Sequence, residues 1–281
     1  MPRINYNAPA MTTVSRMNQI NKHISSSTEK ISSGMRINRA ADDVYGHSTS
    51  EQLRAQIRGM STASRNNQDG IALINVAEGA LNEVTLKLQR MRELSVQAST
   101  ATVTDKDRKN LELEMNNLKE GLDKITQDTE YNGQKLLNGD SPWGTAPGGV
   151  FHVGPNNENN TDYIHYIIPK IDTVELGIDG DNLRMDTQVH ASDAISRLDE
   201  SLNIVSGVRT DLGGISNRLE HNLKNQRVQT ENVQAYESLI RDTDIADEMT
   251  KLTRDQVLKE YSTAMLSQAN MNPQRILKLL E

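Results

Sequence analysis

Two arginines and two aspartates stand close together in residues 32–52, SSGMRINRAADDVYGHSTSEQ, between two amphipathic stretches. Arg36, Arg39, Asp42 and Asp43 can form ion pairs, and their carboxylates can accept backbone N–H groups. Two hypotheses follow. The four residues are solvated charges in a turn between helices, or they form a contact loop whose Arg and Asp pairs meet a neighbouring molecule. The elements on either side must position them.

The other residue types argue against catalysis and bound metal. The chain of 281 residues has no cysteine, which excludes disulfides, thiolate ligands and cysteine nucleophiles. Its six histidines lack the two-histidine helical spacing of a zinc site, although His152 and His165 could meet across a hairpin. No phosphate-binding loop, nucleophile elbow or dinucleotide fingerprint is present. We therefore expect no catalytic residue, no cofactor and no metal.

Charge and hydrophobicity restrict the partners. A net charge of -7 without a basic patch argues against nucleic acid, and no apolar run reaches membrane-spanning length, so no membrane insertion is expected. The first residues, MPRINYNAPAMTTVSRM, lack the apolar core of a secretory signal, which predicts a cytoplasmic protein or export without a cleaved signal. With 35% apolar residues, one Phe and one Trp, the chain is expected to be extended and helical, or to bury apolar faces against its own copies.

Three segments carry apolar residues at alternating spacings of three and four, which is typical of a coiled-coil seam. They cover residues 74–98, 111–125 and 195–223. The first seam consists of Ile74, Ala77, Leu81, Val84, Leu88, Met91, Ser95 and Ala98. Thr104 is a suitable N-cap for the second helix. The sequence thus predicts rods that pack side by side and bury the three seams together.

The start of the first rod is indicated by a capping box. Ser48 followed by Glu51 predicts a helix that begins near Ser48, or slightly earlier at Asp42 or Asp43. Residues 32–47 are then a connector between a terminal helix and the rod.

The segment 133–189 differs in composition from the rods. Gly, Pro and Asn concentrate in NGDSPWGTAPGG and GPNNENNTD, and the β-type runs VFHV and YIHYII flank the second of these. The pattern predicts a hairpin or another small β element inserted between two helical arms.

Both ends of the chain carry weak apolar stripes, over residues 11–35 and 245–269. Polar residues separate the apolar positions, so either helix alone would be marginal. Pro273 interrupts the second stripe, and RILKLL follows it. These ends are expected to need a partner, and their charge balance mildly favours pairing of the N-terminal with the C-terminal segment.

Several motifs resemble those of bacterial flagellins. The run SSGMRINRAADDVYGHSTSEQLRAQIRGM is similar to the family's N-terminal signature, and ASRNNQDGIALINVAEGALNEV, LQRMRELSVQAS and YNGQKLLNG continue the likeness. DLGGISNRLE, SLIRDTDIADEM and AMLSQANMNPQRILKLL resemble the C-terminal half. FHVGPNNENNTDYIHYI resembles the short insert of spirochaete core flagellins, whose filaments lie in the periplasm.

The resemblance implies a mainly α fold: a long coiled-coil-like helical rod with paired N- and C-terminal helices and a small β-hairpin insert. It implies a division into an N-terminal filament-core helix (1–41), the N-terminal half of the rod (42–140), a short β and loop insert (141–189), the C-terminal half of the rod (190–240) and a C-terminal filament-core helix (241–281). The family's large outer domains are absent, because the insert is too short to hold them.

The implied function is structural: a subunit that is exported and polymerises into the helical flagellar filament for motility. The implied partners are other copies of the chain, a flagellin export chaperone, the type III export apparatus, hook-associated and cap proteins, and sheath proteins. The filament would be extracellular, or periplasmic in the spirochaete type. The alternatives are a hook–filament junction protein of related architecture and a soluble coiled-coil adaptor; an enzyme is not expected.

Two sets of residues are candidates for contacts with other molecules. The resemblance to flagellins places a surface recognised by a flagellin-sensing Toll-like receptor at Arg90, Leu94 and Glu114, although the same surface contacts neighbouring subunits. The filament-contact candidates are Arg36, Arg39, Asp42, Asp43, Ile20, Ile24, Leu252, Leu258, Met265, Ile276, Leu279 and Leu280.

Overall fold

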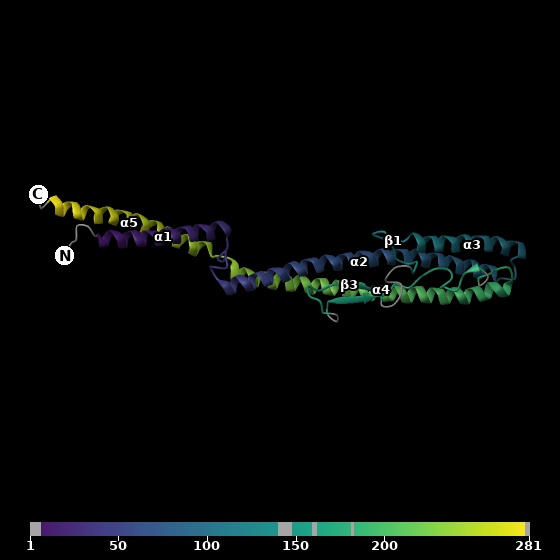
Figure 1. Cartoon of the computed structure of the whole chain (residues 1–281). Helices are drawn as coiled ribbons and strands as arrows, with labels where there is room; N and C mark the ends of the chain where they lie inside the picture. Colours follow the sequence, from purple (N-terminus) through teal and green to yellow (C-terminus); the bar gives the residue numbers. More distant parts are fainter. Residues whose placement is uncertain (1–6, 140–147, 159–161, 181–182, 279–281) are drawn as a thin grey trace. The chain divides into compact units, whose positions relative to one another are not determined.

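The computed structural model describes residues 7–139, 148–158, 162–180 and 183–278. The fold is mainly α and confirms the predicted class, with long helices, paired terminal helices and a small hairpin (Figure 1). The elements are α1 (Ala8–Ser33), α2 (Val44–Ala98), α3 (Asp105–Asp128), β1 (Glu130–Tyr131), β2 (Gln134–Lys135), β3 (Gly149–His152), β4 (Tyr163–Tyr166), α4 (Gln188–Arg241) and α5 (Ile245–Lys278).

The chain divides into two compact units. One contains residues 1–55 and 231–281, and the other contains residues 56–230. Both divisions fall inside long helices, because the first turns of α2 and the last turns of α4 pack with the terminal segments. The predicted boundaries at 41/42 and 240/241 instead lie near the helix ends.

The core of the larger unit combines the three predicted seams, as expected. Leu88 of α2, Met115 and Leu122 of α3, and Leu198 and Leu212 of α4 are all 0% exposed and belong to one apolar cluster. Thr104 caps α3 by accepting from the backbone nitrogen of Asp107, at 3.3 Å, which confirms the predicted N-cap. Three amphipathic helices therefore shield one another from water.

The predicted hairpin is present as the antiparallel pair β3–β4. Its register sets His152 opposite Tyr163 and Val150 opposite His165, so the two histidines are not cross-strand partners. The rings of His152 and Tyr163 meet edge to face at 4.7 Å. A second hairpin, β1–β2, was not predicted. Its signal was the pair Asn132–Gly133, and both residues adopt the positive φ that a two-residue hairpin turn favours.

The segment after β4 contributes more to the core than its irregular sequence suggests. In its described residues, 167–180 and 183–187, it has no long helix or strand. Its apolar side chains are nevertheless almost fully buried in the rod's core: Ile168, Ile171, Leu176, Ile178, Leu183 and Met185. Two residues of α3 hold it. Lys119 Nζ donates to the carbonyl of Leu183 at 2.9 Å, and the Asp123 carboxylate accepts from the backbone nitrogen and hydroxyl of Thr173 at 3.1 and 3.0 Å.

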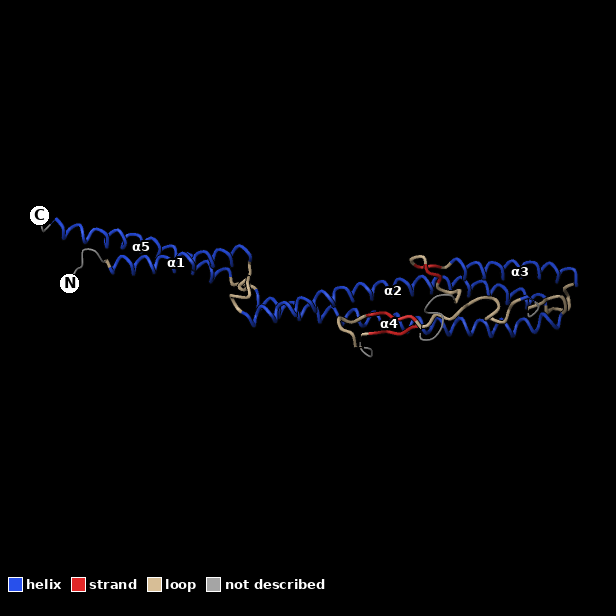
Figure 2. The backbone as a smooth tube through the Cα atoms, viewed as in Figure 1, coloured by secondary structure: helices blue, strands red, loops and turns tan. Residues whose placement is uncertain are grey.

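In the smaller unit, α1 and α5 lie side by side and antiparallel (Figure 2). Near the start of α1, Asn7 Nδ2 donates to the carbonyl of Ala269, and near its end Ser27 reaches Glu248. The expected pairing of the N-terminal with the C-terminal segment is therefore present within one chain.

Candidate functional site

The two connector aspartates hold backbone N–H groups. Asp42 accepts from the backbone nitrogens of Asn38 and Arg39, at 3.1 and 2.9 Å, and the bond from Arg39 is the main cause that lowers the pKa of this carboxyl. Asp43 directly precedes α2 and accepts from the backbone nitrogen of Gly46 at 2.9 Å. Asp42 therefore closes the turn, and Asp43 caps the helix.

Ser48 is not the cap of this helix. It lies inside α2, past the first turn, where the backbone nitrogens already have helical partners. The helix starts earlier, as in the Asp43 alternative, because the Asp43 carboxylate accepts from the backbone nitrogen of Gly46 in the first turn.

The two connector arginines also have partners within the chain. The backbone nitrogen of Arg36 donates to the carbonyl of Arg241 at 2.6 Å, and its Nη2 donates to the carbonyl of Ile240 at 2.7 Å. Arg39 Nη2 lies 2.9 Å from Glu29 Oε1. The connector thus joins the end of α4, and contact of these residues with a neighbouring molecule stays a prediction.

Arg241 holds the connector in place through its side-chain contacts. It was not identified as a site residue from the sequence. It is half-buried, and its Nη1 lies 2.8 Å from Glu51 Oε1 and 3.3 Å from the hydroxyl of Ser50. This guanidinium is the main cause that lowers the pKa of the Glu51 carboxyl. The backbone nitrogen of Thr243 also donates to the carbonyl of Gly34, at 3.0 Å. A positive residue in the last turn of a helix was the available signal.

The seam between α1 and α5 contains both apolar and polar residues. Ile20, Ile24 and Leu252, three of the contact candidates, are half-buried in it. The buried positions are polar or small. Ser27 Oγ donates to Glu248 Oε1 at 2.7 Å, and this bond is the main cause that lowers the pKa of Glu248.

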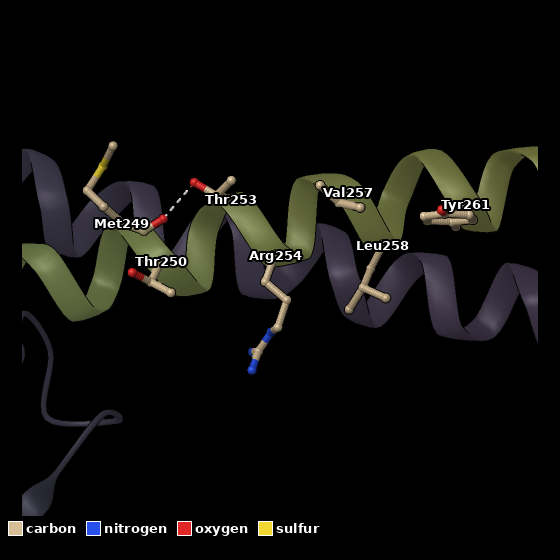
Figure 3. A pocket seen from close by; sticks show the side chains of 7 residues that line it. All are labelled: Met249, Thr250, Thr253, Arg254, Val257, Leu258 and Tyr261. Carbon is tan, nitrogen blue, oxygen red and sulfur yellow. Dashed lines mark hydrogen bonds between the residues drawn. The ribbon is translucent and has the colours of Figure 1, made fainter.

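A shallow groove of about 500 Å³ runs along α5 on the face opposite to the seam (Figure 3). Its side chains stand on successive turns, and the Thr253 hydroxyl donates to the Met249 carbonyl at 2.9 Å. The lining residues are Met249, Thr250, Thr253, Arg254, Val257, Leu258 and Tyr261. Leu258 therefore belongs to the groove, and Met265 lies beyond it with 61% exposure.

The last contact candidates lie outside the described part. Ile276 is within α5, but its side chain is not described, and Leu279 and Leu280 are not among the described residues. The predicted apolar plug beyond Pro273 therefore stays a prediction.

The three residues of the predicted receptor surface separate into two environments. Arg90 Nη2 on α2 lies 2.8 Å from Glu114 Oε1 on α3, and this bond is the main cause that raises the pKa of Arg90. Leu94 is 1% exposed and packs in the core of the rod. In the single chain, only the polar pair is therefore available at the surface.

The described residues offer little for other chemistry. Within residues 7–139, 148–158, 162–180 and 183–278, no group of three His, Cys, Asp or Glu side chains is placed to hold a metal ion. In the same residues, no helix has the length and apolar character needed to cross a membrane.

Comparisons with known proteins agree with this arrangement. Residues 4–141 match the bacterial flagellin N-terminal helical region, and residues 195–280 match the bacterial flagellin C-terminal helical region. A flagellin of Halalkalibacterium halodurans is 44% identical over 279 residues, with 99% of each chain covered. The chain belongs to the bacterial flagellin family. As a flagellin it is a structural protein and a subunit of the flagellar filament.

Relatives from spirochaetes confirm the likeness to core flagellins. A flagellar filament 33 kDa core protein of Treponema phagedenis is 39% identical over 286 residues, with 99% of each chain covered. The Halalkalibacterium relative shows that proteins similar to this flagellin also occur outside the spirochaetes.

A solved structure resembles the fold but carries no functional argument. It is assigned as a flagellar hook-associated protein of Vibrio parahaemolyticus and has a TM-score of 0.54 at 14% identity, covering 71% of this chain and 99% of that chain. At this identity the likeness concerns the fold alone. The flagellin relatives match the full length, so the junction-protein and adaptor alternatives are not favoured.

Proposed function

We propose that this flagellin contacts neighbouring copies in the filament through the outer face of α5. One observation carries the proposal: α5 is apolar on two faces, and α1 covers only one of them. The seam face holds Leu252, while the groove on the opposite face exposes Met249, Val257, Leu258 and Tyr261. Apolar side chains that gather on an exposed face mark an interaction site.

The exposed side chains are large enough to drive association. Tyr261 and Met265 are 67% and 61% exposed, and Met11 on α1 is 60% exposed. Each side chain of this size gains about 1.5–3 kcal/mol on full burial. Contacts repeated in every subunit therefore add up along a filament.

A matched pair of variants tests this proposal. Leu258→Glu places a charge in the groove, whereas Gln256→Glu places the same charge on an exposed position outside it. We expect Leu258→Glu to prevent filaments after addition of seeds or ammonium sulfate, and Gln256→Glu to allow them, as observed by negative-stain microscopy. Both should leave the melting temperature of the rod unchanged. Normal filaments from Leu258→Glu would refute the proposal.

We propose that the same face engages an export chaperone before secretion through the type III apparatus. The support is the apolar groove, which would be exposed in water before assembly. Co-purification of the chaperone with the full chain should fall with Leu258→Glu and persist with Gln256→Glu. Equal recovery with both variants would separate the chaperone site from the groove.

We also propose a route of export and a location for the filament. We expect export without cleavage of a signal, and a filament outside the cell or in the periplasm beneath sheath proteins, contacting hook-associated and cap proteins at its ends. Antibody labelling of intact and permeabilised cells distinguishes the two locations: labelling of intact cells requires an extracellular filament. Mass spectrometry of the assembled subunit tests cleavage.

We propose that Arg90 and Glu114 contribute to receptor recognition, as the flagellin resemblance implies. Their support is an exposed ion pair that joins α2 to α3. Arg90→Ala should lower receptor-dependent signalling by monomers, whereas Arg92→Ala, which removes a different exposed pair with Asp199, should not. Equal signalling by both variants would count against this assignment.

A further inference from the structure

The pairing of α1 with α5 has an unusual composition. On α1, residues Met17, Ile20, Ile24 and Ile31 are half-buried and Ser27 is buried, and they follow the 3–4 spacing of a coiled coil. On α5 the corresponding seam holds two acids, Glu248 and Asp255, one heptad apart. These carboxylates are only 6% and 4% exposed, at positions where a coiled coil ordinarily carries apolar residues.

Each acid faces a polar residue of α1. Ser27 Oγ donates to Glu248 Oε1 at 2.7 Å, and His23 Nδ1 lies 3.8 Å from Asp255 Oδ2. Ser27 and His23 are one helical turn apart. Ser27 makes a hydrogen bond to Glu248, whereas His23, whose side chain is 69% exposed, lies near Asp255 beyond hydrogen-bond distance.

Cations of α5 itself complete each site. Lys251 Nζ lies 3.3 Å from Glu248 Oε2, and Arg254 Nε lies 3.4 Å from Asp255 Oδ1. Because these cations belong to the same helix as the acids, they are present in any register. The partners on α1, Ser27 and His23, lie opposite the two acids in only one register of the helix pair.

Buried carboxylates do not add stability compared with leucine, because their desolvation offsets the gain from pairing. They can instead exclude wrong alignments. If α1 slid by one heptad, Ile20 would replace Ser27 opposite Glu248, and this buried carboxylate would lose its donor from α1 and keep only Lys251. Apolar seam residues such as Ile24 and Leu252 would tolerate the same slide.

We infer that the pairs Ser27–Glu248 and His23–Asp255 set the register of α1 against α5 of the same chain and exclude pairing of α5 with α5 of another copy. Two α5 helices would bring carboxylates into a shared seam without the hydroxyl and imidazole partners. This specificity concerns pairing within one chain, and it does not depend on the groove contacts proposed above.

Spin labels can report the register because the chain has no native cysteine. The double substitution Met11→Cys and Met265→Cys places labels on exposed positions of α1 and α5. In filaments in which doubly labelled chains are diluted with unlabelled chains, we expect one narrow distance distribution between the labels. In the background Glu248→Leu with Asp255→Leu, we expect at least two populations, displaced by about 10 Å, the length of one heptad, with helicity retained.

A matched control distinguishes loss of pairing specificity from nonspecific hydrophobic association. Gln256→Leu with Glu260→Leu makes two polar-to-leucine changes at exposed positions of α5 outside both acid sites. This control should keep the single distance and the monomeric sedimentation of the parent chain, whereas Glu248→Leu with Asp255→Leu should form dimers.

A further variant covers the case in which the leucine chain folds differently. Ser27→Ala leaves Glu248 without its α1 donor and should broaden the distance distribution without adding apolar surface. Several distances in the parent chain, a single unchanged distance in the seam leucine variant, or equal dimerisation of the exposed-face control would each overturn the inference.

Discussion

The seam of the rod and the seam of the terminal pair follow the same spacing but differ in what they bury. In the rod, Leu81, Leu88 and Met91 are 0% exposed. In the terminal pair, Ile24 and Leu252 remain half-buried, and the buried positions are polar or small. The difference arises because the rod's seam is covered by three helices and an irregular segment, whereas α1 and α5 have only each other.

This contrast shows how one chain can contain a rod that is stable by itself and a terminal pair whose stability depends on neighbouring copies. Burying an apolar side chain gains about 1.5–3 kcal/mol, while ordering a residue costs about 1–2 kcal/mol. The rod gains the full benefit within the chain. The terminal pair gains part of it and leaves further apolar surface for neighbouring copies, so we expect the ends to be less protected from hydrogen exchange in the monomer than in the filament.

The largest expected effect comes from removing the end of α5. A chain lacking residues 272–281 should lose polymerisation completely, because the apolar plug of Ile276, Leu279 and Leu280 would be missing, while the rod should melt as before. Calorimetry measures the rod, and microscopy after seeding measures assembly. Normal filaments from the truncated chain would show that the end of α5 is not needed for assembly, contrary to the division into a stable rod and assembling ends.

A cavity in the rod should have the opposite effect. Leu88 is fully buried, so Leu88→Ala should destabilise the rod by about 2–5 kcal/mol. Leu86 on the same helix is 51% exposed, and Leu86→Ala should change stability by less than about 0.5 kcal/mol. Denaturant unfolding compares the two variants. Similar losses would mean that the seam does not carry the stability of the rod.

The cap of α2 should matter less than the core. Asp43→Ala removes the acceptor of the Gly46 backbone nitrogen and should cost about 0.5–2 kcal/mol. Ser48→Ala, within the helix, should have little effect. The measurement is the free energy of unfolding together with hydrogen exchange at the start of α2. A larger loss from Ser48→Ala would restore the capping box as the start of the helix.

The smallest effect should be a pH dependence of the terminal pair. The hydroxyl of Ser27, with Lys251, lowers the pKa of Glu248 below that of an unfolded glutamate, which is about 4.3. Its stabilising contribution is therefore fully present above that value and is lost as pH falls through the lower folded pKa. The protection of α1 and α5 from hydrogen exchange, corrected for the intrinsic pH dependence of exchange, should decrease in this acidic range, with a weaker dependence in Glu248→Gln. An identical dependence in the variant would assign the effect to other carboxyls.

Part of the site could be predicted from the sequence. The 3–4 spacing identified the partners Ile24 and Leu252, and the charge pattern singled out Arg36 and Asp42. The roles of the charges could not be derived, because Arg36 binds the carbonyl of Ile240, which is distant in sequence. The resemblance to flagellins placed Leu94 on a receptor surface, but its side chain is buried in the rod. The position of a residue beside a seam does not show whether another segment of the chain covers it.

The sequence by itself determined the rods, their caps such as Thr104, the β3–β4 hairpin and the family, because helical periodicity, capping and motif order are local properties. Only the tertiary structure decided that residues 167–180 and 183–187 complete the rod's core and that Arg241 closes the connector. It also decided that buried Glu248 meets Ser27. These contacts join residues far apart in the chain, and no local pattern encodes which polar groups come together when apolar surfaces are buried.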